Sequence, residues 1–68
     1  MKWIKLQDKR PTDGSACVVR EVIEGYHPCF ADYGIARFWG DGPDWEFART
    51  LRSAHDTDEY IVIEEGSQ

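Results

Sequence analysis

Residues 34–47 read GIARFWGDGPDWEF, and this pattern predicts a β-hairpin. The middle of the stretch, Gly40-Asp41-Gly42-Pro43, has the composition of a turn, because glycine tolerates positive φ and proline cannot donate a hydrogen bond to a sheet. The hairpin holds two of the three tryptophans and two of the three phenylalanines of the chain. Large rings on paired strands bury much area in a short chain, so we expect the rest of the protein to pack around it.

Strand alternation assigns the hairpin side chains to two faces. On the first strand Ala36 and Phe38 share one face, and the alternate residues share the other: Ile35, Arg37 and Trp39. On the returning strand Trp45 and Phe47 share a face opposite Glu46. The two strands together are therefore expected to present an aromatic face to the core.

Three other segments have the composition of strands. Residues 3–6 form a short first strand, and residues 16–23 carry apolar side chains on both faces, which is typical of a central strand. Between them, Asp13-Gly14 predicts a turn that needs positive φ at the glycine. Residues 59–64 alternate most clearly of all and predict the last strand.

The connections are less regular. Residues 24–28 predict a second turn, and residues 29–33 fit either a wide connection or an irregular strand. The hairpin is expected to end near Ala48, followed by a loop in which a helical turn over residues 50–54 is optional. We predict one domain over residues 1–68 that is mainly β, with an antiparallel sheet of four to five strands in meander order. The helical turn would make the class α+β.

Composition narrows the classes of partner. Eight basic and 13 acidic residues give a net charge of −5, which repels nucleic-acid phosphates and anionic lipid but suits a basic patch on a protein. The apolar runs are far shorter than the ~20 residues of a membrane span. The chain opens without a signal-peptide core, so we expect a cytoplasmic protein with reduced cysteines.

Metal binding and catalysis are not expected from the residue pattern. Cys17, His27, Cys29 and His55 are zinc ligands by type, but they lack the tight paired spacing of structural zinc sites. A thiol nucleophile would need one of the cysteines with a histidine base and an orienting carboxylate such as Asp56, and in so short a chain these types co-occur by chance. We predict no cofactor, no metal and no enzymatic activity.

Two acidic clusters are the candidate partner-binding residues. One follows the hairpin turn and consists of Asp41, Asp44 and Glu46; the other precedes the last strand and consists of Asp56, Asp58 and Glu59. Such runs either serve solubility or dock on Arg and Lys of a partner. The N-terminal cations Lys2, Lys5, Lys9 and Arg10 are expected to pair with the acidic C-terminal segment across neighbouring strands.

The order of the N-terminal motifs carries a family resemblance. Trp3-Ile4, then Pro11 with Asp13-Gly14, then the strand of Cys17, Val18 and Val19 resembles the small phage and prophage proteins grouped as domain of unknown function 551. The aromatic pair in residues 36–39 fits the same pattern. The family closes on a strand of the type T-H-W-x-P-L-P, whereas residues 58–63 have Tyr60 and no proline. The resemblance implies a phage or prophage origin and a β-rich fold, and it implies no reaction.

These observations support three functional hypotheses. The leading one is a non-enzymatic phage-type protein in the host cytoplasm that binds a host protein through its acidic surface and inhibits a defence nuclease or another nucleic-acid enzyme. The second is a small β-barrel-like nucleic-acid binder that stacks bases on Tyr26, Trp39 and Trp45. The third is a structural or accessory phage component.

Overall fold

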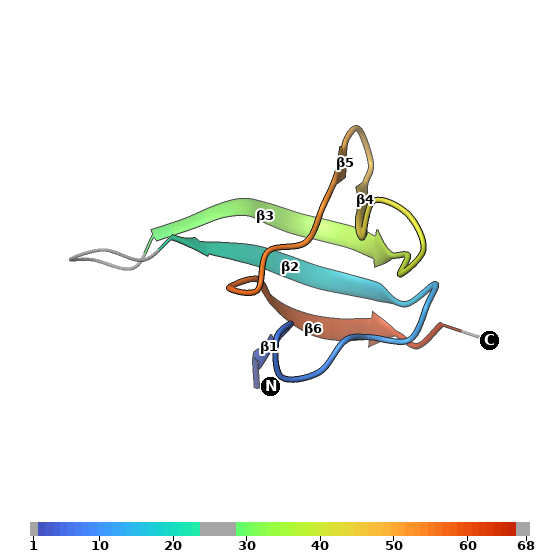
Figure 1. The fold of residues 1–68 in the computed structure, drawn as a ribbon, viewed down its shortest axis with the longest axis horizontal. Helices are drawn as coiled ribbons and strands as arrows, with labels where there is room; N and C mark the ends of the chain where they lie inside the picture. Colours follow the sequence, from blue (N-terminus) through green and yellow to red (C-terminus); the bar gives the residue numbers. More distant parts are fainter. Residues whose placement is uncertain (1, 24–28, 67–68) are drawn as a thin grey trace.

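The computed structural model describes residues 2–23 and 29–66, the first four residues of the second range by their backbone only. The described chain forms one open antiparallel sheet in the spatial order β1-β6-β2-β3-β4-β5 (Figure 1). Its strands are β1 (Ile4–Lys5), β2 (Ala16–Ile23), β3 (Cys29–Phe38), β4 (Trp45–Phe47), β5 (Leu51–Arg52) and β6 (Glu59–Glu64).

The mainly β, antiparallel class predicted from the sequence is confirmed. Strands β2 to β5 follow one another in meander order, but β6 lies between β1 and β2, so the meander does not extend to the whole sheet. The strand count also exceeds the predicted four to five, because the segment after β4 forms an additional two-residue strand, β5, at an edge of the sheet. The optional helical turn over residues 50–54 is absent from the described chain, and β5 occupies that segment.

The predicted hairpin is present. β3 pairs with β4 in a register that sets Phe38 opposite Trp45 and Ala36 opposite Phe47. Gly14 adopts a φ of 85°, as predicted for the turn before β2. The ambiguous segment 29–33 belongs to β3, whereas the turn predicted at 24–28 lies outside the described residues.

The core lies on one side of the sheet, which we call the inner face. It contains Leu6, Cys17, Val19, Ala36, Phe38, Trp45 and Tyr60, all at most 2% exposed. Trp45 is fully buried. The centroid of its ring lies 5.2 Å from that of Phe38, in an edge-on arrangement, and 6.1 Å from that of Tyr60. Trp45 thus lies in the core, on the same face as Phe47 as predicted for the returning strand, and its ring joins the hairpin to β6.

Irregular segments, rather than a second sheet or a helix, cover the inner face. The chain after β5 crosses β3 and β2 on its way to β6 (Figure 1). Leu6 donates its backbone N–H to the carbonyl of Asp58, which ties the loop after β1 to this crossing segment. The opposite side of the sheet, which we call the outer face, carries the alternate residues such as Ile35 and Trp39. Within the described residues, no helix is long and apolar enough to cross a membrane.

Candidate functional site

Three segments that are far apart in the sequence meet at one end of the sheet, beside the last residues of β3 and β6 (Figure 1). Gly40, in the turn after β3, donates its N–H to Asp13 Oδ1 at 2.9 Å. Gly66, after β6, donates its N–H to Ser15 Oγ at 2.8 Å. The loop before β2 is therefore bonded both to the hairpin turn and to the C-terminal segment.

Most of the net charge of the chain collects at this end. We call this end of the sheet the acidic end. Its carboxylates are Asp13, Asp41, Asp44, Glu46, Glu64 and Glu65. The basic side chains among them are Arg10, which pairs with Asp44 at 2.9 Å, and Arg37, which is in register with Glu46. With six carboxylates against two guanidinium groups, the acidic end carries four of the five net negative charges.

The carboxylates of the acidic end differ in solvent exposure and in the contacts that they make. Asp41, Glu46, Glu64 and Glu65 are exposed, whereas the Asp44 side chain is only 18% exposed. Asp44 also accepts the backbone N–H of Ala54 at 3.0 Å, so it joins the hairpin turn to the segment after β5. Asp44 thus holds the site together, and the exposed carboxylates form the surface that a partner could reach.

The second predicted cluster does not form a surface site. Asp58 is fully buried, and Glu59 is held by Arg20 at 2.6 Å with its side chain 16% exposed. Asp56 is the one exposed member of the three. A partner cannot reach Asp58 without unfolding the loop around it, so its assignment as a partner-binding residue is wrong.

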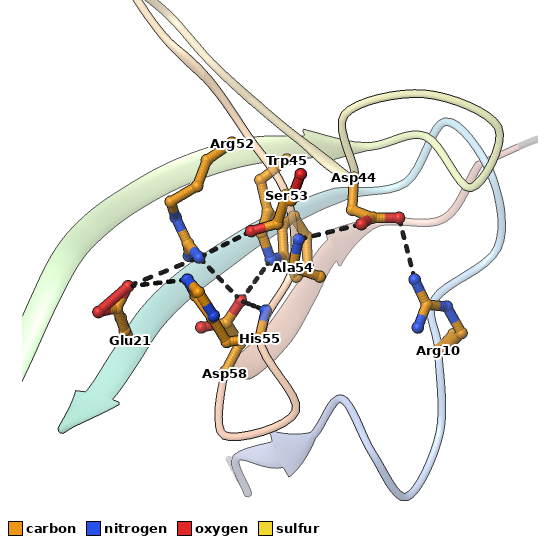
Figure 2. A network of polar contacts seen from close by, with 9 residues as sticks. All are labelled: Arg10, Glu21, Asp44, Trp45, Arg52, Ser53, Ala54, His55 and Asp58. Atoms are coloured by element: carbon orange, nitrogen blue, oxygen red, sulfur yellow. Dashed lines mark hydrogen bonds and ion pairs between the residues drawn. The ribbon is translucent and has the colours of Figure 1, made fainter. Parts of the chain in front are cut away.

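Asp58 instead organises a buried polar network (Figure 2). Its Oδ2 accepts the indole N–H of Trp45 at 2.9 Å and the backbone N–H of His55 at 3.0 Å, and it lies 3.2 Å from Arg52 Nη1. Arg52 Nη1 also lies 3.6 Å from Glu21 Oε2. One carboxylate thus fixes the central tryptophan, the tight turn before β6 and the cation on β5.

The N-terminal strand β1 lies beside β6, which is the strand neighbourhood expected for the N-terminal cations. Lys5 is in register with Glu59, as expected from pairing between the first strand and the acidic C-terminal segment. Arg10 instead pairs with Asp44 of the hairpin turn. Another cation, Arg20, holds Glu59 and stacks over the ring of Trp3, with Cζ 4.0 Å from its centroid.

The thiol of Cys17 is unsuited to nucleophilic chemistry. It lies in the core, fully buried, and burial together with the nearby Glu65 carboxylate raises its pKa to about 11 from 9.0. The described residues also hold no group of three or more histidine, cysteine or carboxylate side chains placed to bind a metal. The side chains of His27 and Cys29, named above as zinc ligands by type, lie outside the described part.

Among the depressions on the surface of the described residues, we consider two that lie beside the sheet, and neither gathers catalytic groups. The first, about 350 Å³, lies along the free side of β3 beyond Phe47 and is lined by Tyr33, Gly34, Ile35, Phe47, Ala48, Arg49 and Thr50. The second, about 440 Å³, lies beside β1 and is lined by Lys2, Trp3, Ile4, Lys5, Asp8 and Glu59. Their linings offer neither a nucleophile with a base nor a cradle for phosphate.

Compared with protein-family models, with curated proteins and with solved structures, the chain matches none of them. The function is therefore inferred from the site itself. The sequence named three residues of the acidic end as a site but did not join Asp13, Glu64 and Glu65 to them. The signal for these three was the Asp13-Gly14 turn and the acidic end of the last strand, but only the pairing of β2 with both β3 and β6 brings them to the same place.

Proposed function

We propose that this chain is a non-enzymatic protein that binds another protein by docking its acidic end on a basic patch. The observation that carries the proposal is the segregation of charge, with four of five net negative charges at one end of the sheet. Clustered charges of one sign steer a complementary surface toward the site and raise the association rate.

The kind of partner follows from the spacing and type of the charges. Exposed carboxylates on the hairpin and on the C-terminal segment present several anionic oxygens at one end of the sheet, and a phosphate backbone also presents a series of anionic oxygens. A protein groove that binds nucleic acid carries the matching Arg and Lys side chains. A defence nuclease or another nucleic-acid enzyme of the host is therefore the class of partner we propose, in the host cytoplasm, and the resemblance to phage proteins favours the same class.

The nucleic-acid-binding alternative has less support. Trp45 cannot serve as a stacking platform because it is fully buried, and Tyr26 lies outside the described residues. Trp39 is 37% exposed, but its indole N–H is donated to Glu46 within the acidic end. A phosphate backbone beside Trp39 would meet carboxylates rather than a basic groove.

The test is a pair of charge-matched variants. Asp41→Lys with Glu65→Lys reverses two exposed carboxylates of the acidic end and changes the net charge from −5 to −1. Asp8→Lys with Asp56→Lys gives the same net charge but reverses exposed residues elsewhere. Each protein is immobilised and used to capture partners from a bacterial lysate, followed by mass spectrometry and by association rates with the protein captured.

We expect the wild type and the Asp8 and Asp56 variant to retain the same protein, and the acidic-end variant to lose it. The association rate should fall with added salt, because exposed charges are screened over a Debye length of ~8 Å at physiological ionic strength. Nucleic acid should compete for the partner. Equal retention by both variants, with no effect of salt, would contradict docking through the acidic end.

A further inference from the structure

The longest strand of the sheet is paired on one side only over much of its length. β3 is in register with β2 from residue 29 to residue 37, whereas β4 is in register with β3 only at residues 36–38. Within the described chain, residues 29–35 therefore have a strand on one side and an open edge on the other. An open strand edge presents backbone N–H and C=O groups that can pair with another chain.

The hydrogen bonds at the end of β3 show which backbone groups point toward the open edge. Phe38 donates its N–H to the carbonyl of Ser15, on the β2 side. Trp39, one residue later, donates its N–H to the carbonyl of Asp44, on the β4 side. Backbone groups alternate between the two sides of a strand, so the N–H of Ile35 points the same way as that of Trp39. In the described residues this N–H has no acceptor, because the pairing with β4 ends at Phe47.

The depression of about 350 Å³ lies along this open edge. On the inner side of the sheet, the ring of Phe47 lies beside Gly34, where a Cβ would be 3.7 Å from the ring. On the outer side, Tyr33 and Ile35 are each 65% exposed. A strand that lies in the depression would therefore meet apolar side chains on both of its faces.

The charge at this depression is positive although the chain as a whole is acidic. Arg49 is the one charged residue among those that line it, and its side chain is exposed. The arginines at positions 10, 20 and 52 form ion pairs with carboxylates, whereas Arg49 has no ion pair within the part of the chain that the structure describes. An exposed guanidinium without a partner favours a ligand that carries a carboxylate.

We propose that the open edge of β3 binds an extended, acidic segment of another protein, which adds to the sheet as an antiparallel strand. A carbonyl of the segment accepts the N–H of Ile35, and its apolar side chains contact Phe47 on one face and Tyr33 on the other. A carboxylate of the segment pairs with Arg49. Strand addition of this kind gains affinity from the backbone and specificity from alternate side chains. This proposal does not rest on the acidic end having a protein partner.

A β-bulge limits the length of the added strand. β3 advances from Gly34 to Ala31 while β2 advances only from Val19 to Glu21, so β3 holds one extra residue there. Such a bulge bends the strand, increases its twist and disfavours continuous pairing along the edge. We therefore expect the bound segment to be short and to bind reversibly.

The first test uses the full chain and a library of short random peptides displayed on phage. We expect the peptides retained by the immobilised wild type to share alternating apolar residues and a carboxylate. The selected peptide is then synthesised, and its affinity is measured by calorimetry. At saturating peptide, amide exchange at Ile35 should slow by at least about tenfold, because its N–H becomes hydrogen-bonded.

Two variants of Ile35 separate the backbone contact from the side-chain contact. Ile35→Pro removes the N–H at the open edge and leaves the hydrogen bonds to β2, since proline is tolerated where the N–H of a strand faces solvent. The matched control is Ile35→Ala, which keeps the N–H and shortens the side chain. We expect Ile35→Pro to bind the selected peptide at least about tenfold more weakly than Ile35→Ala does. Circular dichroism reports whether each variant is folded.

A second test reverses the charge beside the depression. Arg49→Glu should weaken binding of the selected peptide by about tenfold, and a peptide with lysine in place of the carboxylate should prefer this variant to the wild type. The control is Lys9→Glu, which makes the same change of charge at an exposed residue outside the depression. This charge exchange decides the proposal even if Ile35→Pro fails to fold.

Three results would overturn the proposal. The first is that no peptide is retained above the level of the support alone. The second is that Ile35→Pro and Ile35→Ala bind the selected peptide equally, with no slowing of exchange at Ile35. The third is that sedimentation shows a dimer of the wild type that Ile35→Pro abolishes, which would assign the open edge to a second copy of this chain.

Discussion

Removing the carboxylate of Asp58 should unfold much of the protein, although the residue lies in a polar loop. Asp58→Ala removes the acceptor for the Trp45 indole N–H at 2.9 Å and for the His55 N–H at 3.0 Å, and it removes an anion 3.2 Å from Arg52. Loss of one partner of a buried ion pair costs about 3–5 kcal/mol, because the other charge stays in a poorly solvated place. A domain of 68 residues is expected to have only ~3–10 kcal/mol of stability in all.

Asp58→Asn removes the negative charge of residue 58 but keeps an oxygen that can accept hydrogen bonds, so it measures the two contributions separately. Its amide oxygen can still accept from Trp45 and His55, and Arg52 keeps the Glu21 carboxylate at 3.6 Å. We therefore expect a smaller loss of stability, about 1–3 kcal/mol, in line with hydrogen bonds to charged groups. The control is Asp56→Asn, because Asp56 is exposed in the same loop. The free energy of unfolding of this variant should stay within about 0.5 kcal/mol of the wild-type value.

Thermal and urea unfolding, followed by tryptophan fluorescence, measure all three variants. The expected order of stability is Asp56→Asn, then Asp58→Asn, then Asp58→Ala, and the last should melt at least about 12 °C below the wild type. Trp45→Phe keeps a ring but removes the donor, so a double-mutant cycle with Asp58→Ala should give a coupling energy of about 1–2 kcal/mol. If Asp58→Ala melts together with Asp56→Asn, the buried network does not hold the fold.

The remaining predictions concern the core and the joined segments. Trp45→Ala should cost about 3–5 kcal/mol in urea melts, as truncation of a core ring does, whereas Trp39→Ala should cost roughly 1 kcal/mol because that ring is partly exposed on the outer face. Gly66→Ala should release the C-terminal segment, since a Cβ there would overlap the backbone of residues 13–15, and faster amide exchange at residues 64–66 would report it. Between pH 9 and 11 the unfolded chain loses the Cys17 proton while the native state keeps it, so the free energy of unfolding should fall by about 2–3 kcal/mol as the pH rises. Cys17→Ala removes the thiol and should reduce this fall. A variant whose stability depends on pH just as the wild type's does would contradict the role of Cys17.

Local patterns were sufficient to locate most of the strands. The predicted bounds of residues 16–23 and 59–64 coincide with β2 and β6, because alternation and flanking turn residues are encoded within each segment. The hairpin faces were predicted for the same reason, and so was the positive φ of Gly14. Each of these features depends on residues within a few positions of one another.

Features that depend on distant segments were not predictable from one sequence. The place of β6 between β1 and β2 is set by packing across more than 40 residues, and nothing local distinguishes it from a continued meander. Asp58 looked like part of a solvated acidic run because its three neighbours before it are polar. A buried indole needs an acceptor for its N–H, but the sequence does not say which carboxylate supplies it.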